Sequence, residues 1–480
     1  MKTKKLSVLL SFMAAMVILI IIIASSTAAT KAYADGSTLI LNERKKVSNV
    51  GDEQWFYYTP EDSRYYVVET SGGEDTVLRV GNAYFEIVND NIVPSNPNSR
   101  IYFKPEAGRQ FRVDIRFCFS FSNQYSYLQL RKQRFSMFGY VDHKDNNSAK
   151  DFGTPYDKFK NLYDCVKYEN VPSNTVTDTD ERGLAPLNSE MFFFSGHGYG
   201  DGSGVTFYQN KKSVGKLKVD NMSFNMDKTR VAMWSACCSA NEPSSSPCIA
   251  RKSVLEGAGA SVGFKKEITF ASGRKFTNKF FSVLASGGTV AEAASAGKGA
   301  IIWAWDNAKE YVLFGDRTVR VTDETPSGEE FYSLPANYEY LREELASGYV
   351  AEPLDGNDTR YYQIINGYLA DSYIDITEVN GRITAIDDHR KTFDSVLEID
   401  ENYLNKGCEE SVCADGQAYT MREQDEEHIV YCNLDGVMTP VKVSFVVYTG
   451  TNGDIYCEAY CINLNDGSSI DYGDICGLEE

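Results

Sequence analysis

Histidine is scarce in this chain, which narrows where proton-transfer chemistry can occur. The 480 residues include only four, His143, His197, His389 and His428. Imidazole is the side chain best suited to moving protons near neutral pH, so few positions can do so here. The sequence also lacks internal repeats and low-complexity tracts, which argues against solenoid and fibrous architectures.

Basic residues are fewer than acidic ones. The chain carries 48 Lys and Arg residues against 67 Asp and Glu, a formal net charge of −19 at pH 7. Such an acidic surface disfavours nucleic acids and anionic membranes. We therefore expect no nucleic-acid partner, and we interpret the charge as favouring solubility outside the cell.

Long apolar runs are absent except at the start of the chain. Lys2, Lys4 and Lys5 precede the apolar run Leu6–Ala24, and Ala32-Tyr33-Ala34 follows as an A-x-A cleavage site. This pattern predicts a signal peptide over residues 1–34 and a secreted or cell-surface protein. The run is long enough to anchor the chain if it stays uncut. After cleavage, no stable membrane insertion is expected.

Cysteines are numerous, and eleven of them in an exported chain favour disulfides. Six crowd the C-terminal end: Cys408, Cys413, Cys432, Cys457, Cys461 and Cys476. Their pairing stays open, since six cysteines allow fifteen connectivities. Their spacing does not match a zinc site. The odd total leaves at least one thiol without an intrachain partner.

The sequence predicts three domains after the signal peptide. Residues 35–135 contain short aromatic and β-branched runs between turn residues, typical of a β-sandwich. Residues 136–310 alternate strands with helices, including an expected helix from Tyr156 to Val166, and indicate an α/β fold with a mainly parallel sheet flanked by helices. Residues 311–480 carry the hairpin signals Asn366-Gly367, Asn380-Gly381 and Asn452-Gly453, typical of a cysteine-rich α+β domain.

Two apolar runs in the central domain each end on a reactive side chain. Met191–Phe194 leads into Ser195-Gly196-His197-Gly198, and Arg230–Trp234 leads into Ser235-Ala236-Cys237-Cys238. Short apolar runs of this kind read as buried parallel strands, whose carboxyl ends carry the sites of open α/β folds. A His and a Cys at two such ends suit attack by a thiolate on a carbonyl.

The two blocks resemble the signature of the caspase-like (clan CD) cysteine peptidases, closest to the bacterial clostripain, gingipain and CHAT-type members. Gly257–Phe264 resembles the next core strand of that fold, and Thr289–Ala294 a late helix. The resemblance covers roughly residues 136 to 310. It implies a secreted endopeptidase with a Cys237/His197 dyad, acting on a protein or peptide substrate through an acyl-enzyme. It also implies an oxyanion site formed by the N–H groups of Gly198 and Cys237.

The resemblance leaves several points open. It implies no cofactor and no metal site, although some members use calcium; the acidic loops here lack a complete calcium-loop pattern. Many members are made as zymogens, so a flanking domain is a candidate restraint on the cleft. Cys237 fits the pattern better than Cys238. Cys238 has three possible states: a disulfide with Cys248, a vicinal disulfide with Cys237, or a buried thiol.

Specificity is weakly encoded. Bacterial members often cut after Arg or Lys, which implies an acidic residue in the substrate pocket. The candidates are Asp142, Asp145, Asp201 and Glu267, each also readable as a solvated loop acid. Lys265, Lys266 and Arg274 follow the later core strand and provide the alternative, an acidic substrate residue. We expect a basic one, on the frequency in the family that the chain resembles.

The N-terminal domain has a looser resemblance. The order Asp52-x-x-Trp55-Phe56, Tyr65–Val68 and Asp75–Leu78 is similar to the bacterial pre-peptidase C-terminal domain, here placed N-terminal to the central domain. This resemblance implies that the N-terminal domain binds a surface or acts as a spacer. Two rivals to the peptidase remain: a non-catalytic surface-binding protein with an inert caspase-like domain, and a transpeptidase.

Overall fold

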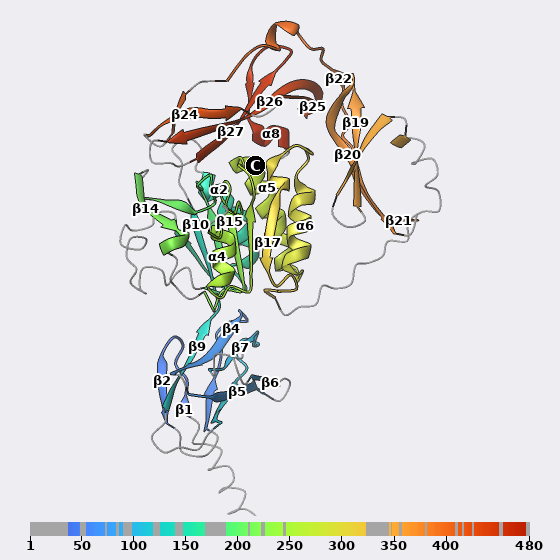
Figure 1. The fold of residues 1–480 in the computed structure, drawn as a ribbon. Helices are drawn as coiled ribbons and strands as arrows, with labels where there is room; N and C mark the ends of the chain where they lie inside the picture. The colour runs from blue at the N-terminus through green and yellow to red at the C-terminus, as the bar shows by residue number, and fades with distance from the viewer. Residues whose placement is uncertain are drawn as a thin grey trace, which may run out of the picture. The chain divides into compact units, whose positions relative to one another are not determined.

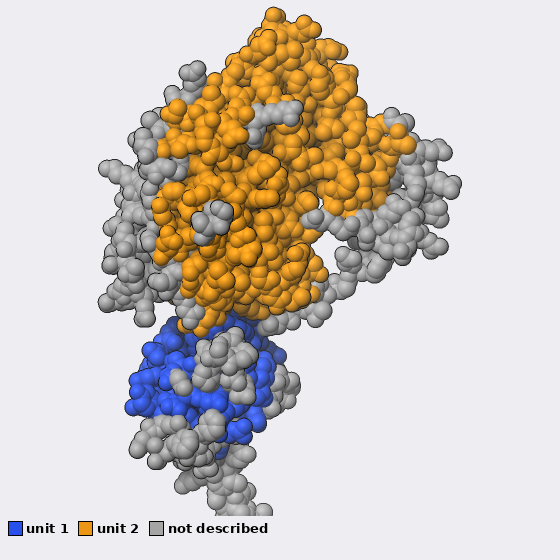
Figure 2. Space-filling model, viewed as in Figure 1, with its two compact units in different colours: residues 1–133 blue, residues 134–480 orange. Residues whose placement is uncertain are grey.

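The computed structural model describes residues 37–476 apart from 49–53, 73, 83–85, 90–97, 119–124, 140–146, 169–188, 210–211, 222–225, 243–245, 323–344, 347, 355–357, 380–381, 409–410, 415–416, 425–426 and 451–454. It divides into two compact units, residues 1–133 and 134–480 (Figure 2). The expected signal peptide lies outside the described residues. Among the residues that are described, no helix is long and apolar enough to cross a membrane.

The first unit is a sandwich of two sheets. Its strands are β1 Ser37–Thr38, β2 Arg44–Ser48, β3 Gln54–Tyr58, β4 Tyr66–Ser71, β5 Thr76–Gly81, β6 Glu86–Asn89, β7 Arg100–Phe103, β8 Phe111–Phe117 and β9 Tyr125–Lys132. One sheet has the order β1-β3-β8-β5-β6 and the other β2-β9-β4-β7. In β5, Thr76, Leu78 and Val80 are buried and alternate with partly exposed residues. This period of two places one face of the strand in the core.

A buried ion cluster lies in the four-stranded sheet of this unit. The Glu69 carboxylate accepts from Arg100 Nε at 2.9 Å and from Arg131 Nε at 3.1 Å. The side chains of Glu69 and Arg100 are only 7% and 5% exposed. A charge this deeply buried needs a partner, so the three side chains tie β4, β7 and β9 together.

Glu69→Ala should therefore destabilise the sandwich by about 3–5 kcal/mol, because it removes the carboxylate that is paired with the buried Arg100 guanidinium. Hydrogen exchange of peptides from β4 and β9, measured on the full chain by mass spectrometry, reports the local free energy of unfolding. Glu106→Ala is the matched control, since the Glu106–Arg109 pair is largely exposed. Equal effects of the two substitutions would contradict the buried-cluster interpretation.

The second unit contains a six-stranded sheet that positions the candidate site (Figure 1). Its strands are β10 Arg134–Gly139, β11 Asp164–Tyr168, β12 Met191–Ser195, β15 Val231–Ser235, β16 Ala260–Phe264 and β17 Tyr311–Gly315. The order is β11-β10-β12-β15-β16-β17, and every neighbouring pair is parallel except β16 and β17. Because β17 completes this sheet, the sheet extends beyond the domain boundary expected at residue 310.

Helices cover both faces of this sheet. They are α2 Asn147–Phe159, α4 Ile249–Leu255, α5 Phe270–Ala285 and α6 Val290–Ala300. Phe193 packs edge-on against Phe281 of α5 on one face, whereas Phe192 packs against Trp234 in the cluster that contains Ile249 of α4. Successive residues of β12 thus point to opposite layers. This explains why the strand reads as a continuous apolar run.

The helix expected from Tyr156 to Val166 is wrong at its C-terminal half. Helix α2 ends at Phe159, and Val166 lies in β11, paired with Ser136 of β10. Tyr163 is fully buried in the turn between them, and its hydroxyl donates to the Val321 carbonyl. Strand pairing and this burial override the helical spacing, which the aromatic residues satisfy only by coincidence.

The remaining elements of the second unit are mostly strands. A hairpin is formed by β13 Gly204–Gln209 and β14 Lys212–Lys218. The short helical elements are the 3₁₀ turns η3 Val219–Asn221, η4 Asn307–Lys309 and η5 Glu401–Tyr403, and the helix α8 Tyr472–Cys476. The C-terminal strands are β18 Tyr349–Pro353, β19 Asp358–Ile365, β20 Tyr368–Val379, β21 Arg382–His389, β22 Ser395–Val396, β23 Ser411–Ala414, β24 Gln417–Gln424, β25 His428–Leu434, β26 Val437–Gly450, β27 Ile455–Asn463 and β28 Ser469–Ile470. Strands β18 to β28 form a single eleven-stranded sheet.

The hairpin signals in this sheet have mixed outcomes. Asn366-Gly367 joins β19 to β20 with both residues at positive φ (51° and 86°), as a type I′ turn requires. Asp435-Gly436 forms a similar turn (51° and 83°) between β25 and β26. Asn380-Gly381 and Asn452-Gly453 lie outside the described residues. Cys408, Cys432 and Cys461 carry free thiols in this structure, so disulfide stapling of this region stays a prediction.

Candidate active site

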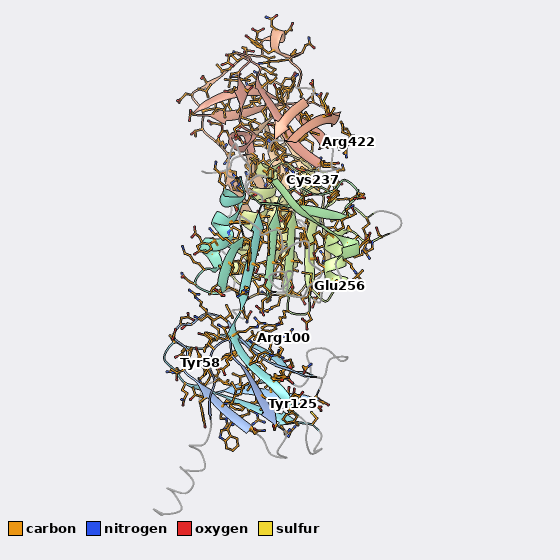
Figure 3. All side chains as sticks on the ribbon, turned by 90° about the vertical axis from the view of Figure 1, so that its left-hand side faces the viewer. Tyr58, Arg100, Tyr125, Cys237, Glu256 and Arg422 are labelled. Carbon is orange, nitrogen blue, oxygen red and sulfur yellow. The ribbon has the colours of Figure 1, made fainter. Side chains whose placement is uncertain are left out.

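His197 and Cys237 follow neighbouring strands that are paired in register. Ser195 at the end of β12 pairs with Ser235 at the end of β15, and each reactive residue comes two positions later. Neighbouring strands are about 4.8 Å apart, so this register brings the two loops together at the carboxyl edge of the sheet. Figure 3 shows Cys237 at that edge and Glu256, which precedes β16, near the opposite edge.

The two side chains share one small pocket. It is lined by Gly196, His197, Ser235, Cys237, Ile268, Thr269, Phe270 and Cys457. His197 and Cys237 are only 2% and 5% exposed. The cavity measures about 10 Å³. A space of about 10–15 Å³ is the least that holds one water molecule. The pocket is therefore closed to a peptide in the state described.

Gly198 lies directly against the backbone of Cys237. A Cβ atom placed on Gly198 would clash with the Cys237 carbonyl oxygen and would lie 3.2 Å from its nitrogen. Gly198 forms an antiparallel bridge with Val205, flanked by hydrogen bonds from Thr206 N to His197 O (3.1 Å) and from Tyr199 N to Gly204 O (3.1 Å). In such a bridge the N–H and C=O of the central residue point away from its partner strand.

The turn that carries Cys237 is tightly held. Cys238 adopts a left-handed conformation (φ 55°), and its N–H donates to Lys266 O at 3.0 Å. The Ser239 hydroxyl donates to Trp234 O at 2.9 Å and accepts from Phe264 N at 3.0 Å. A non-glycine residue at positive φ costs energy, and such residues cluster at functional sites.

The loop that carries His197 is fixed from behind by a buried polar network. Ser195 Oγ donates to the Asp151 carboxylate of α2, and Arg274 Nε of α5 donates to the same carboxylate at 2.6 Å. Burial raises the pKa of Asp151, against the lowering effect of Arg274. Arg274 is thus occupied within the fold. The Phe270 ring packs edge-on to His197 with a centroid separation of 5.8 Å.

Burial dominates the electrostatics of the Cys237 thiol. Its Sγ donates to Ile268 O at 3.5 Å, and burial raises the pKa of Cys237 to about 12, with Glu267 adding to the rise. Thr269 caps the N-terminus of α5, which lies at the same pocket. The positive end of a helix dipole favours an anion, so it opposes part of this effect.

The acidic candidates have different positions. Asp142 and Asp145 lie outside the described residues. Asp201 is in an exposed turn, where its carboxylate accepts from Ser203 N at 2.9 Å, and it does not line the described pocket. Glu267 lies in the loop between β16 and α5, close enough to raise the pKa of Cys237, and forms an ion pair with Arg422 of β24.

The neighbouring cysteines have separate environments. Cys238 and Cys248 carry free thiols in this structure. The Cys238 thiol hydrogen-bonds to Glu267, and burial raises its pKa above the ordinary range. Cys248 is the N-cap of α4, where its Sγ accepts from Arg251 N at 3.4 Å. Of the three states considered for Cys238, the structure has the buried thiol.

Sequence reasoning missed the residues that close the pocket. Ile268, Thr269 and Phe270 follow β16, and the capping threonine before an amphipathic helix was a usable signal for them. Cys457 and Arg422 come from strands of the C-terminal sheet, and nothing local in their segments connects them to His197. Among the described residues, no group of three or more His, Cys, Asp or Glu side chains could hold a metal ion.

Comparisons with known proteins give little. No protein-family model matches the chain, and no curated protein matches it either. A solved structure of the pre-peptidase C-terminal domain of a collagenase from Bacillus anthracis aligns with 9% identity, over 20% of this chain and 94% of that domain, at a TM-score of 0.17. A likeness at that score carries no argument about fold or function.

Gly198→Ala should disrupt the pocket, because the added methyl group has no space beside the Cys237 carbonyl. We expect destabilisation of the second unit by about 1–3 kcal/mol, as for other overpacked sites. Hydrogen exchange of peptides from β12 and β15 measures it. Gly153→Ala in α2 is the matched control, since a Cβ there meets no atom within 4 Å. An unchanged exchange rate in Gly198→Ala would contradict the close approach.

Alkylation of Cys237 should depend steeply on pH. A pKa raised to about 12 keeps the thiol protonated at neutral pH, so the thiolate fraction rises about tenfold per unit between pH 7 and pH 9. Iodoacetamide labelling of the full chain, quantified by peptide mass spectrometry, should show this rise without a plateau. A plateau below pH 9 would show that the thiol is less buried than described.

Proposed function

We propose that the chain is an exported, caspase-like cysteine endopeptidase. One observation carries this proposal: the register of β12 and β15 places an imidazole and a thiol, each two residues past a paired serine, in the same pocket. That arrangement supports nucleophilic catalysis by a Cys/His dyad. The mixed α/β architecture and the mainly parallel sheet agree with such an enzyme without identifying it.

The proposed mechanism uses the side chains in distinct roles. Cys237 Sγ, once deprotonated, would attack the carbonyl carbon of the scissile peptide bond, and the carbonyl π electrons would move to its oxygen. The N–H groups of Gly198 and Cys237 would donate to that oxyanion. The oxyanion electrons would then re-form the carbonyl and the C–N bond would break, while His197, which holds the thiol proton, would give it to the departing amine and leave a thioester on Cys237. Water would then hydrolyse the thioester and regenerate the thiol.

Glu267 is the acid best placed to select a substrate side chain. It is the candidate that lies beside Cys237 among those described, and it already binds a guanidinium. A basic residue before the scissile bond would therefore be favoured. Bound in that position, its positive charge would also offset the effect of Glu267 on the pKa of Cys237.

A second candidate function is supported by the closed pocket. A cavity of about 10 Å³ and a thiol with its pKa near 12 suit a surface-binding protein whose central domain does not turn over. The N-terminal sandwich would then be the binding module. This alternative predicts no covalent reaction of Cys237 with peptide-like electrophiles under any condition.

Activity-based labelling distinguishes the two functions. We expect an acyloxymethyl ketone with Arg or Lys in the recognition position to label Cys237 of residues 35–480, and label to fall more than about 100-fold in His197→Ala. Cys237→Ala should abolish the label, whereas Cys238→Ala is the matched control and should keep most of it. Label on Cys238, or none in any variant with or without reductant and calcium, would contradict the peptidase. Turnover with an added amine nucleophile separates hydrolysis from transpeptidation.

A further inference from the structure

Strand β27 of the C-terminal sheet lies against the glycine loop of the candidate site. Ile455 N donates to Gly198 O at 3.3 Å. A Cβ on Gly200 would clash with the Ile455 side chain, and Cys457, two residues on, lines the pocket itself. Gly198 C=O and N–H point to the same side, away from Val205. The backbone edge of Gly198, with which a substrate peptide would pair, is therefore already hydrogen-bonded to β27.

A second contact comes from β24. Arg422 forms an ion pair with Glu267, and its Nη1 lies 3.1 Å from the position a Gly200 Cβ would take. Its charge is near enough to Cys237 to lower the pKa of that thiol, whereas Glu267 raises it. Figure 3 shows Arg422 on the C-terminal strands at the edge of the sheet that carries Cys237.

The C-terminal sheet is firmly docked beside α5. Asp306, which is buried, accepts from Ser272 Oγ of α5 at 2.6 Å and from Tyr472 Oη of α8 at 2.7 Å. Arg360 of β19 donates to Ile301 O, just past α6, at 2.7 Å. Helix α5 begins at Phe270, a pocket residue. These bonds attach α8 and β19 beside α5 and α6, and β19 belongs to the same sheet as β24 and β27.

We propose that Arg422 is a built-in occupant of the Glu267 subsite, and that Arg422 together with the Ile455 edge of β27 keeps the Cys237 pocket shut. This inference rests on the proposed function for its biological meaning. It deepens that function by making the C-terminal sheet an internal inhibitor. The guanidinium stands where a basic substrate side chain would bind, so a substrate must displace it or the sheet must move.

The charges and solvent exposure of Glu267 and Arg422 agree with a subsite that Arg422 already occupies. The Glu267 carboxylate is 16% exposed, and a carboxylate so little hydrated needs a cation beside it. Arg422 remains 38% exposed, so it approaches from solvent, as a substrate side chain would. Displacing it by a substrate Arg or Lys exchanges one cation for another at little electrostatic cost. An acidic or neutral side chain would leave Glu267 unpaired.

The test is the rate at which iodoacetamide alkylates Cys237 in the full chain, which requires an open pocket but no peptidase activity. Arg422→Glu replaces attraction to Glu267 by repulsion, so we expect the rate to rise about fivefold, the upper end of what one exposed ion pair contributes. This is a net rise, because loss of the Arg422 charge also raises the pKa of Cys237 and lowers the thiolate fraction. Arg390→Glu is the matched control. It breaks the ion pair with Asp388, its side chain is as exposed as that of Arg422, and neither residue lines the pocket, so the rate should stay unchanged.

A charge exchange tests the specific contact. Glu267→Arg combined with Arg422→Glu rebuilds the ion pair in reverse and should return alkylation towards the parent rate. Equal rates in the parent and Arg422→Glu, or an equal rise in Arg390→Glu, would overturn the inference. Hydrogen exchange of the second unit checks that each variant is folded.

A second arm separates this inference from the proposed function. With the basic acyloxymethyl ketone, Arg422→Glu should label faster than the parent. Faster alkylation without any probe label would support the closed pocket and contradict the peptidase. Probe label that is equally fast in the parent and in Arg422→Glu would support the peptidase and overturn the internal inhibitor.

Discussion

The candidate site depends on the register between β12 and β15. Once Ser195 pairs with Ser235, the glycine loop and the cysteine turn must leave the sheet side by side. The aromatic side chains of β12 alternate between two helical layers, with Phe192 against Trp234 and Phe193 against Phe281. The buried Asp151–Ser195–Arg274 network then fixes where β12 ends. The packing that positions β12 in the core therefore also positions the loop that carries His197.

Backbone approach is the second requirement of the site. Gly198 contacts the Cys237 backbone more closely than any side chain permits, and Cys238 accepts a left-handed conformation to make the turn. The Ser239 hydroxyl joins the ends of β15 and β16 across that turn. The cost of the strained residue is met by these hydrogen bonds and by the rigid sheet beneath them.

The electrostatics of the site describe a resting state. The Cys237 thiol is buried, protonated and next to a carboxylate, all of which oppose thiolate formation. Arg422 and the N-terminus of α5 act in the opposite direction, but the first also fills the space beside Glu267. In the proposed peptidase, a substrate cation that replaced Arg422 in an opened pocket would keep the favourable charge and admit the substrate. Reactivity and access would then change together.

The sequence by itself determined the strands that carry His197 and Cys237, because buried parallel strands read as apolar runs and their ends as glycine and small residues. It also predicted the Asn366-Gly367 hairpin, whose turn residues act locally. It misjudged the segment after Phe159, since aromatic spacing does not reveal that Val166 pairs with β10. Only the tertiary structure decided that Glu267 meets Arg422 and that Ile455 bonds to Gly198. Those contacts join residues more than 150 positions apart, and no local pattern encodes which distant strands will pack together.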